Sequence, residues 1–102
     1  MLSGRKLGVL LSGPPQGPGF AHGARLAEAA LGGGVRVYLY CIDDAVTGLA
    51  GLQSLKNKGA HVYACAYGAQ RRQVPTSDQA AFAGLGSLSD LMAGTDRFVH
   101  FP

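Results

Sequence analysis

Two cysteines, Cys41 and Cys65, are the side chains of this sequence best suited to nucleophilic chemistry. Cys65 ends the apolar segment HVYAC and is followed by AYGAQRR, which is predicted to form a short helix. The thiolate is the reactive form of cysteine, and positive charge or a helix N-terminus favours it. The backbone N–H groups of residues 66–68 and the guanidinium groups of Arg71 and Arg72 could therefore stabilise a Cys65 thiolate.

Sulfur transfer is the chemistry that such a thiolate would suit. The thiolate attacks a sulfane sulfur, holds it as a persulfide and then offers it to the next thiolate. A free cysteine is more often a small buried hydrophobic residue, and the residues around Cys65 alone favour that interpretation. Cys41 has the same two interpretations, as a possible second thiol or as a core residue, and core packing is favoured.

The segment GPPQGPG, residues 13–19, is the strongest turn signal in the chain. It resembles a phosphate-binding loop only in its glycine content, because the Lys-Ser/Thr pair of a P-loop does not follow it. Two adjacent prolines also leave the segment with few N–H donors. An irregular loop is therefore favoured over a nucleotide site.

Three histidines and an aspartate pair complete the polar candidates. His22 lies near the start of a predicted helix, where it could assist proton transfer, although a solvated side chain is favoured. His61 and His100 alternate with apolar residues and are interpreted as packing or rim residues. Asp43 and Asp44 could bind a metal, but helix capping is the favoured role.

Alternating strands and helices must position these residues. Strands are predicted over Lys6–Ser12, Val35–Ile42, His61–Cys65 and Arg97–Phe101, with a short one in the AFAGLG segment. Helices are predicted over Phe20–Leu31, Ala45–Lys58, Ala66–Gln73 and Ser87–Ala93, the last with Ser87 as N-cap. This alternation with short connections predicts a parallel α/β sheet, whose sites lie at the carboxyl ends of the strands.

Composition and charge exclude several classes of function. The 102 residues, 47% of them hydrophobic, predict a single domain over residues 1–102, small enough to gain stability by oligomerising. A net charge of +3 without a Lys/Arg run longer than two residues argues against nucleic-acid binding. Two cysteines are too few for a disulfide scaffold, and no spacing matches a zinc site. We see no signal peptide and no membrane span, so we expect a cytoplasmic protein without a metal or cofactor.

The order of these segments resembles one known family. The chain runs from KLGVLLS through an Ala-rich helix to VRVYLYCIDDAV, and from a Leu-striped helix ending NKGAHVYAC to AYGAQRR and GLGSLSDLMAGTDRFVHF. In this order it is similar to the DsrE/DsrF/DsrH-like family, which includes the Tus sulfur-relay subunits. The resemblance covers nearly the whole chain. The segment around Cys65 and the closing segment carry most of it.

The resemblance implies a three-layer α/β/α fold with a parallel sheet of four to five strands in the order 4-3-2-1-5. It implies a carrier cysteine after the third strand, which Cys65 matches, and a homo-oligomer that exchanges sulfur with donor and acceptor thiol proteins, a TusA-like protein being one candidate. The family often has Arg-Gly shortly after the cysteine, whereas Gln73 follows Arg72 here. With strands two and three adjacent, about 4.8 Å apart, Cys41 and Cys65 could approach each other if they leave the same face.

With the resemblance, we expect a sulfur carrier or sulfurtransferase subunit that acts through a Cys65 persulfide, with no membrane or direct nucleic-acid partner. The Asp43-Asp44 and Arg71-Arg72 pairs would flank the site and help to select a partner protein. The first alternative is a non-catalytic binding or assembly module of the same fold. The second is a nucleotide- or flavin-binding domain of flavodoxin-like outline, against which the missing phosphate signature argues.

Overall fold

The β-branched and Ala/Leu-rich segments form alternating strands and helices in the computed structural model, which describes residues 4–102. The strands are β1 Lys6–Leu11, β2 Arg36–Cys41, β3 His61–Cys65, β4 Ala81–Ala83 and β5 Arg97–Phe101. The helices are α1 Pro18–Gly32, the 3₁₀ helix η1 Asp43–Leu52, α2 Gln53–Asn57, α3 Ala66–Arg71 and α4 Leu85–Gly94. Within these residues, no helix is long and apolar enough to span a bilayer.

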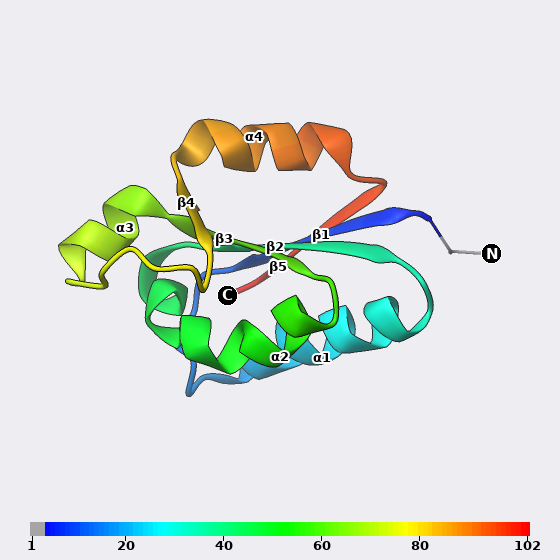
Figure 1. Cartoon of the computed structure of the whole chain (residues 1–102), viewed down its shortest axis with the longest axis horizontal. Coiled ribbons are helices and arrows are strands. Elements are labelled where there is room, and N and C mark those ends of the chain that lie inside the picture. The colour runs from blue at the N-terminus through cyan, green and yellow to red at the C-terminus, as the bar shows by residue number, and fades with distance from the viewer. Residues whose placement is uncertain (1–3) are drawn as a thin grey trace.

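The five strands pair in parallel in the order β4-β3-β2-β1-β5 (Figure 1), which confirms the expected sheet. Parallel strands end at the same edge of a sheet, so β1, β2 and β3 all deliver the residues that follow them to one edge. Helix α3 projects from that edge, at the left of Figure 1. The topology therefore gathers the end of β2 and the end of β3 where a site is expected.

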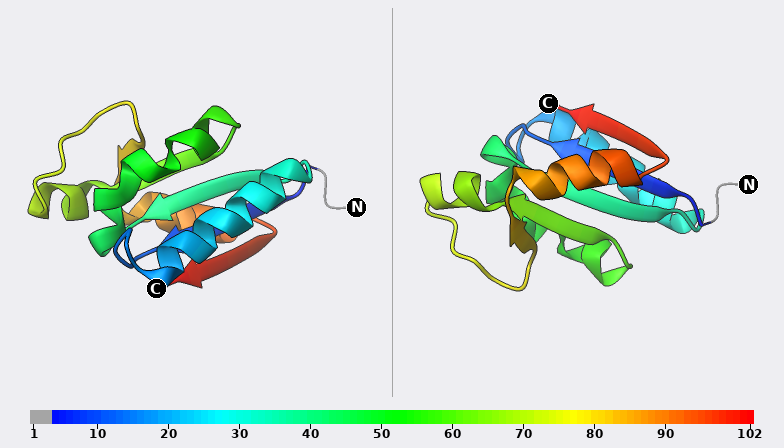
Figure 2. Two further views of the ribbon diagram at one scale, coloured as in Figure 1. Left: turned by 90° about the horizontal axis from the view of Figure 1, so that it is seen from below. Right: turned by 90° about the horizontal axis from the view of Figure 1, so that it is seen from above.

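Helices cover the two faces of the sheet unequally. Helices α1 and α2 lie on one face, and α4 lies on the other (Figures 1 and 2), which gives the expected three-layer α/β/α architecture. The face toward α1 is densely buried, with side chains from both the sheet and the helices, among them Val9, Leu11, Val37, Leu39, Val62, Phe20, Leu49 and Leu52. In contrast, α4 buries none of its residues completely and contributes the half-buried Leu88 and Leu91.

The glycine-rich loop has a packing role in this fold. A Cβ atom added at Gly19 would lie 1.9 Å from the carbonyl oxygen of Pro102, because the chain passes directly beside the end of β5 at this point. Figure 2 shows the C-terminus next to the start of α1. The close backbone approach explains why glycine is required there. It supports the interpretation of residues 13–19 as a structural loop.

Helix α1 begins earlier than the apolar stripe predicts. The stripe indicates a start at Phe20, whereas Gly17 is the N-cap and Pro18 is the first helical residue. Proline suits this position because its fixed φ angle is already helical and its missing N–H would have no helical partner. The Gly-Pro-Gly segment therefore contained the signal for the helix start, but it was assigned to the preceding loop.

The segment predicted as a single helix over residues 45–58 is helical over nearly that span, but it is not one regular α-helix. The segment is the 3₁₀ helix η1 followed directly by the short α2, and η1 has a kink at Gly48, whose φ of −106° and ψ of 16° are not helical. A Cβ atom at Gly48 would lie 2.7 Å from Cζ of Phe20, so this glycine admits the aromatic ring. Long-range packing of Phe20, which no local pattern reveals, explains the kink.

Two predicted helix caps are also wrong. Ile42 is the N-cap of η1 and makes no side-chain cap hydrogen bond, so Asp43 and Asp44 are the first residues of the helix. Asp43 has φ 50°, a left-handed conformation that aspartate tolerates better than most residues. Helix α4 begins at Leu85 with Gly84 as N-cap, so Ser87 lies inside its first turn.

Tyr40 connects the centre of the sheet to the start of α4. Its side chain is fully buried, and its hydroxyl donates one bifurcated hydrogen bond to the carbonyl oxygens of Ala83 at 3.1 Å and Gly84 at 2.9 Å. Its ring stacks on that of Tyr63 in β3, with centroids 6.3 Å apart. One side chain thus ties β2, β3 and the β4–α4 junction together.

We predict that Tyr40→Phe lowers the free energy of unfolding by about 1–2 kcal/mol, because it removes the donor of the bifurcated hydrogen bond to Ala83 and Gly84. Tyr63→Phe is the matched control, since the Tyr63 hydroxyl makes no protein hydrogen bond within residues 4–102. Urea denaturation of both variants measures the difference. Equal stability of the two variants would contradict this role of Tyr40.

Candidate functional site

Cys65 lies at the junction of β3 and α3. It is the N-cap residue of α3, and its sulfur accepts a hydrogen bond from the backbone N–H of Gly68 at 3.4 Å. A side chain that accepts from the third residue of a helix is a capping geometry, here made by a thiol instead of the usual hydroxyl or carboxylate.

A hollow of about 360 Å³ opens beside this sulfur. Its lining comes from the β2–η1 junction, the end of β3, helix α3 with its C-cap, and the start of α4: Ile42, Asp43, Cys65, Tyr67, Gly68, Arg71, Arg72 and Leu85. Cys65 is 6% exposed, so its sulfur sits at the inner wall of the hollow. The rim is partly apolar, because Tyr67 is 64% exposed and Leu85 is 61% exposed.

Tyr40 is the structural neighbour of the thiol on the sheet. Burial raises the pKa of the Tyr40 hydroxyl, and negative charge on Cys65 raises it further. The hydroxyl therefore stays neutral, and its proton is held by the carbonyl groups of Ala83 and Gly84. The residue was not among the candidates from sequence, because nothing in the strand pattern distinguishes Tyr40 from its neighbours Tyr38 and Tyr63.

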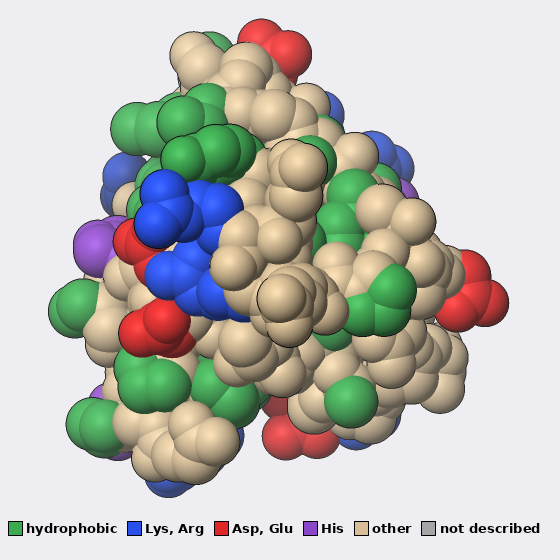
Figure 3. All heavy atoms as spheres, turned by 90° about the vertical axis from the view of Figure 1, so that its left-hand side faces the viewer, with side chains coloured by type: hydrophobic (Ala, Val, Ile, Leu, Met, Phe, Trp, Pro, Cys, Tyr) green, Lys and Arg blue, Asp and Glu red, His purple; other side chains and the backbone are tan. Residues whose placement is uncertain are grey.

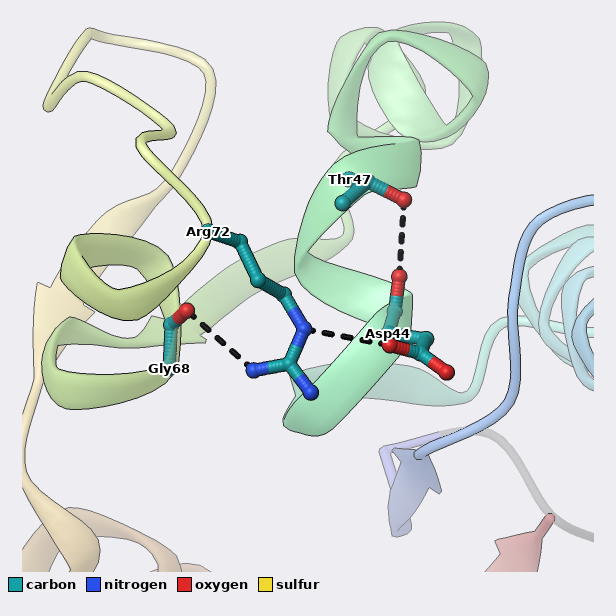
Figure 4. A network of polar contacts seen from close by, with 4 residues as sticks. All are labelled: Asp44, Thr47, Gly68 and Arg72. Carbon is teal, nitrogen blue, oxygen red and sulfur yellow. Dashed lines mark hydrogen bonds and ion pairs between the residues drawn. The ribbon is translucent and has the colours of Figure 1, made fainter.

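Arg72 braces the wall of the hollow. Its Nε donates to the carboxylate of Asp44 at 3.1 Å, and its Nη1 donates to the carbonyl oxygen of Gly68 at 3.4 Å (Figure 4). The Thr47 hydroxyl donates to the carbonyl oxygen of Asp44 at 2.8 Å. These contacts join α3 to η1, so the structure uses Arg72 and Asp44 as one ion pair and not as two separate charged edges.

Arg71 has different contacts. Its Nη1 donates to the Tyr67 hydroxyl at 3.0 Å, and its guanidinium carbon lies 5.7 Å from the centre of the Tyr67 ring. Figure 3 views the end of the molecule from which α3 projects and shows basic side chains gathered there beside hydrophobic and acidic ones. The structure thus brings Cys65, Arg71 and Arg72 to one hollow.

Cys41 does not reach this hollow. It pairs in register with Ala64, and successive residues of a strand point to opposite faces, so Cys41 and Cys65 leave opposite faces of the sheet. Cys41 is completely buried, and burial raises the pKa of its thiol to about 12. The two cysteines are free, and the expectation that Cys41 could act as a second thiol at the site is not supported by this placement.

The histidines lie apart from Cys65. His22 is exposed on α1, on the other side of the sheet, and His61 is exposed at the start of β3, where it stacks on Tyr38 with centroids 4.8 Å apart. His100 shares a 2.7 Å hydrogen bond with the Ser12 hydroxyl. Within residues 4–102, no group of three His, Cys, Asp or Glu residues is arranged to hold a metal ion.

The fold has a counterpart among solved structures. The crystal structure of the ychN protein from E. coli superimposes with a TM-score of 0.85, covering 95% of this chain and 99% of that one at 21% sequence identity. No protein-family model and no curated protein sequence matches the chain. The structural match supports a DsrE-like fold. At 21% sequence identity it is evidence for the fold and not for a function.

We predict that iodoacetamide at pH 8 labels Cys65 in the native protein and leaves Cys41 unlabelled. A thiol with a pKa of about 12 is protonated at this pH and has no path to solvent, whereas Cys65 opens onto the hollow. Unfolding in urea should make the two thiols equally reactive, which provides the control. Peptide mapping by mass spectrometry identifies the labelled site, and native labelling of Cys41 ahead of Cys65 would contradict the assignment.

Proposed function

We propose that this protein is a sulfur carrier of the DsrE-like type, which holds sulfane sulfur as a persulfide on Cys65 and passes it between thiol proteins in the cytoplasm. The observation that carries the proposal is the position of Cys65, which ends a parallel strand, caps a helix and faces a hollow at the sheet edge. The DsrE-like fold and the family resemblance of the segment around Cys65 support it.

The chemistry requires two steps of the same kind. In the first, the Cys65 thiolate attacks the outer sulfur of a donor persulfide, a new S–S bond forms, and the donor leaves as a thiolate. In the second, an acceptor thiolate attacks the outer sulfur on Cys65, and Cys65 leaves as the thiolate. No net oxidation occurs, so the reaction needs no redox cofactor.

The surroundings of Cys65 suit the leaving and attacking roles of one sulfur. The Gly68 N–H contacts the sulfur directly and stabilises its anionic form in both steps. The hydrogen bond from Gly68 fixes the position of the sulfur, while the hollow gives a second sulfur room to extend from Sγ by about 2 Å, the length of an S–S bond. A thiol fixed in this way would need little rearrangement between the free and the loaded states.

The rival candidate is a non-catalytic assembly module, and the 6% exposure of Cys65 is the observation that favours it. Apolar surface for assembly is present on α4, where Leu85 and Met92, 61% and 55% exposed, are seven residues apart and share one helix face. The two candidates are compatible in one respect, since a sulfur carrier can also assemble. Only the reactivity of Cys65 separates them.

We predict that incubation with inorganic polysulfide adds one sulfur atom to the intact mass of the native protein. Cys65→Ser should abolish this adduct, whereas Cys41→Ala should retain it, because Cys41 lies on the opposite face. Intact-mass spectrometry without reductant, followed by cyanide treatment to remove sulfane sulfur, makes the measurement. An adduct that survives in Cys65→Ser would reverse the assignment, and no adduct at all would favour the assembly module.

We also propose that the chain forms a homo-oligomer through its thinly covered α4 side. Light scattering at micromolar concentration should give a mass well above the 10.5 kDa of one chain. Met92→Lys should shift the mass toward that of the monomer, because it places a charge in the proposed contact, while Arg25→Glu on the exposed surface of α1 serves as the control. A monomeric mass for the unaltered protein would refute this part of the proposal.

A further inference from the structure

The two arginines at the hollow are not equivalent. Arg72 already faces the Asp44 carboxylate and the Gly68 carbonyl oxygen, and its side chain is 30% exposed. Arg71 is exposed, and within residues 4–102 no carboxylate lies within 4.0 Å of it. Arg71 therefore presents a full positive charge at the mouth of the hollow, whereas the charge of Arg72 is neutralised locally.

Tyr67 holds Arg71 in place for an incoming group. The phenol accepts one N–H of the guanidinium and its ring lies 5.7 Å from the guanidinium carbon, which leaves most of the five N–H donors free. A guanidinium with two parallel free donors binds a carboxylate in a bidentate manner. Because the side chain is already ordered, less conformational entropy is lost when the carboxylate binds.

The rest of the rim defines where such a carboxylate would sit. The exposed face of Tyr67 offers apolar contact next to Arg71, and Tyr67 lines the same hollow as Cys65. Asp43, which is exposed and also lines the hollow, carries a negative charge that would repel the donor carboxylate. Since α3 carries Arg71 and η1 carries Asp43, the hollow has a positive wall and a negative wall.

We propose that Arg71 is the specificity residue of the hollow, and that the sulfur donor is a protein segment with an Asp or Glu next to its persulfide cysteine. The proposal rests on the sulfur-carrier function and names the partner of that site. The donor carboxylate binds Arg71, which places the outer sulfur against Cys65. The Cys65 thiolate then forms a bond to that sulfur, the donor S–S bond breaks, and the donor cysteine leaves as a thiolate while the proton stays on the transferred sulfur.

Thiol–disulfide exchange with charged peptides tests this selectivity without knowledge of the natural donor. The probes are the symmetrical disulfides of three blocked tripeptides, Gly-Cys-Glu, Gly-Cys-Gln and Gly-Cys-Lys. Mixed-disulfide formation at Cys65 is followed by mass spectrometry in Cys41→Ala protein at low salt, and each rate is divided by that of the same peptide with a free small thiol. This normalisation removes the intrinsic effect of charge on the disulfide.

We expect the Glu peptide to react about two- to fivefold faster than the Gln peptide, the range of a single exposed ion pair, and the Lys peptide to react most slowly. Arg71→Gln should abolish the Glu preference, and Arg71→Lys should restore part of it. Asp43→Asn should increase it, since Asn also tolerates the left-handed conformation of this position. Arg36→Gln, the same charge change at the opposite edge of the sheet, should leave it unaltered.

Two outcomes would overturn the inference while the sulfur-carrier function stands. One is equal normalised rates for the Glu and Gln peptides, and the other is a Glu preference that persists in Arg71→Gln. A different result, in which Cys65 of the native protein reacts with none of the three peptides but does so after unfolding, would overturn the carrier function and this inference with it.

Discussion

The alternation of side chains along β3 is the constraint on which this site depends. Neighbouring parallel strands in register place paired residues on the same face, so the pairing of Cys41 with Ala64 sends Cys65 to the other face. A shift of one residue in the β2–β3 register would pair Cys41 with a residue of the other set along β3 and bring the two cysteines to one face. The observed register instead leaves one thiol in the core and one at the edge of a hollow.

The two cysteine environments differ in the physical terms that control thiol reactivity. Cys41 is surrounded by apolar side chains, and burial without a charged partner raises its pKa to about 12. Cys65 instead receives an N–H from Gly68 and lies in a hollow whose wall is fixed by the Arg72–Asp44 ion pair. Burial alone would make both cysteines inert. The end of β3 and the turn into α3 give Cys65 a hydrogen-bond donor and an opening.

Much of the fold could be predicted from sequence because most strands are short apolar runs and the longer helices have apolar residues at helical spacing. KLGVLL and RVYLYC are apolar runs of strand length, and α1 has a clear stripe from Phe20 to Leu31. The family resemblance supplied the strand order, which periodicity does not contain. The kink at Gly48 escaped prediction because it depends on Phe20, which is distant in sequence.

The candidate site was predictable in position but not in its charges. The strand-to-helix transition at Cys65 and the following AYGAQRR locate the end of a strand. Parallel α/β folds place their sites at the carboxyl ends of the strands, so the position of the site follows. That Arg72 pairs with Asp44 while Arg71 lies over Tyr67 depends on how α3 packs against η1, which spacing does not show. The same holds for Cys41, whose face is decided by register.

We propose that in the folded protein Cys65, and not Cys41, carries sulfur. The ¹³C chemical shifts of the two cysteine Cβ atoms, measured by NMR on uniformly labelled protein before and after loading with polysulfide, test it at the atom concerned. We expect that the Cβ signal of Cys65 moves to the value of a persulfide and returns on reduction, while the Cβ signal of Cys41 does not change. A shift at Cys41 with an unchanged Cys65 would contradict it.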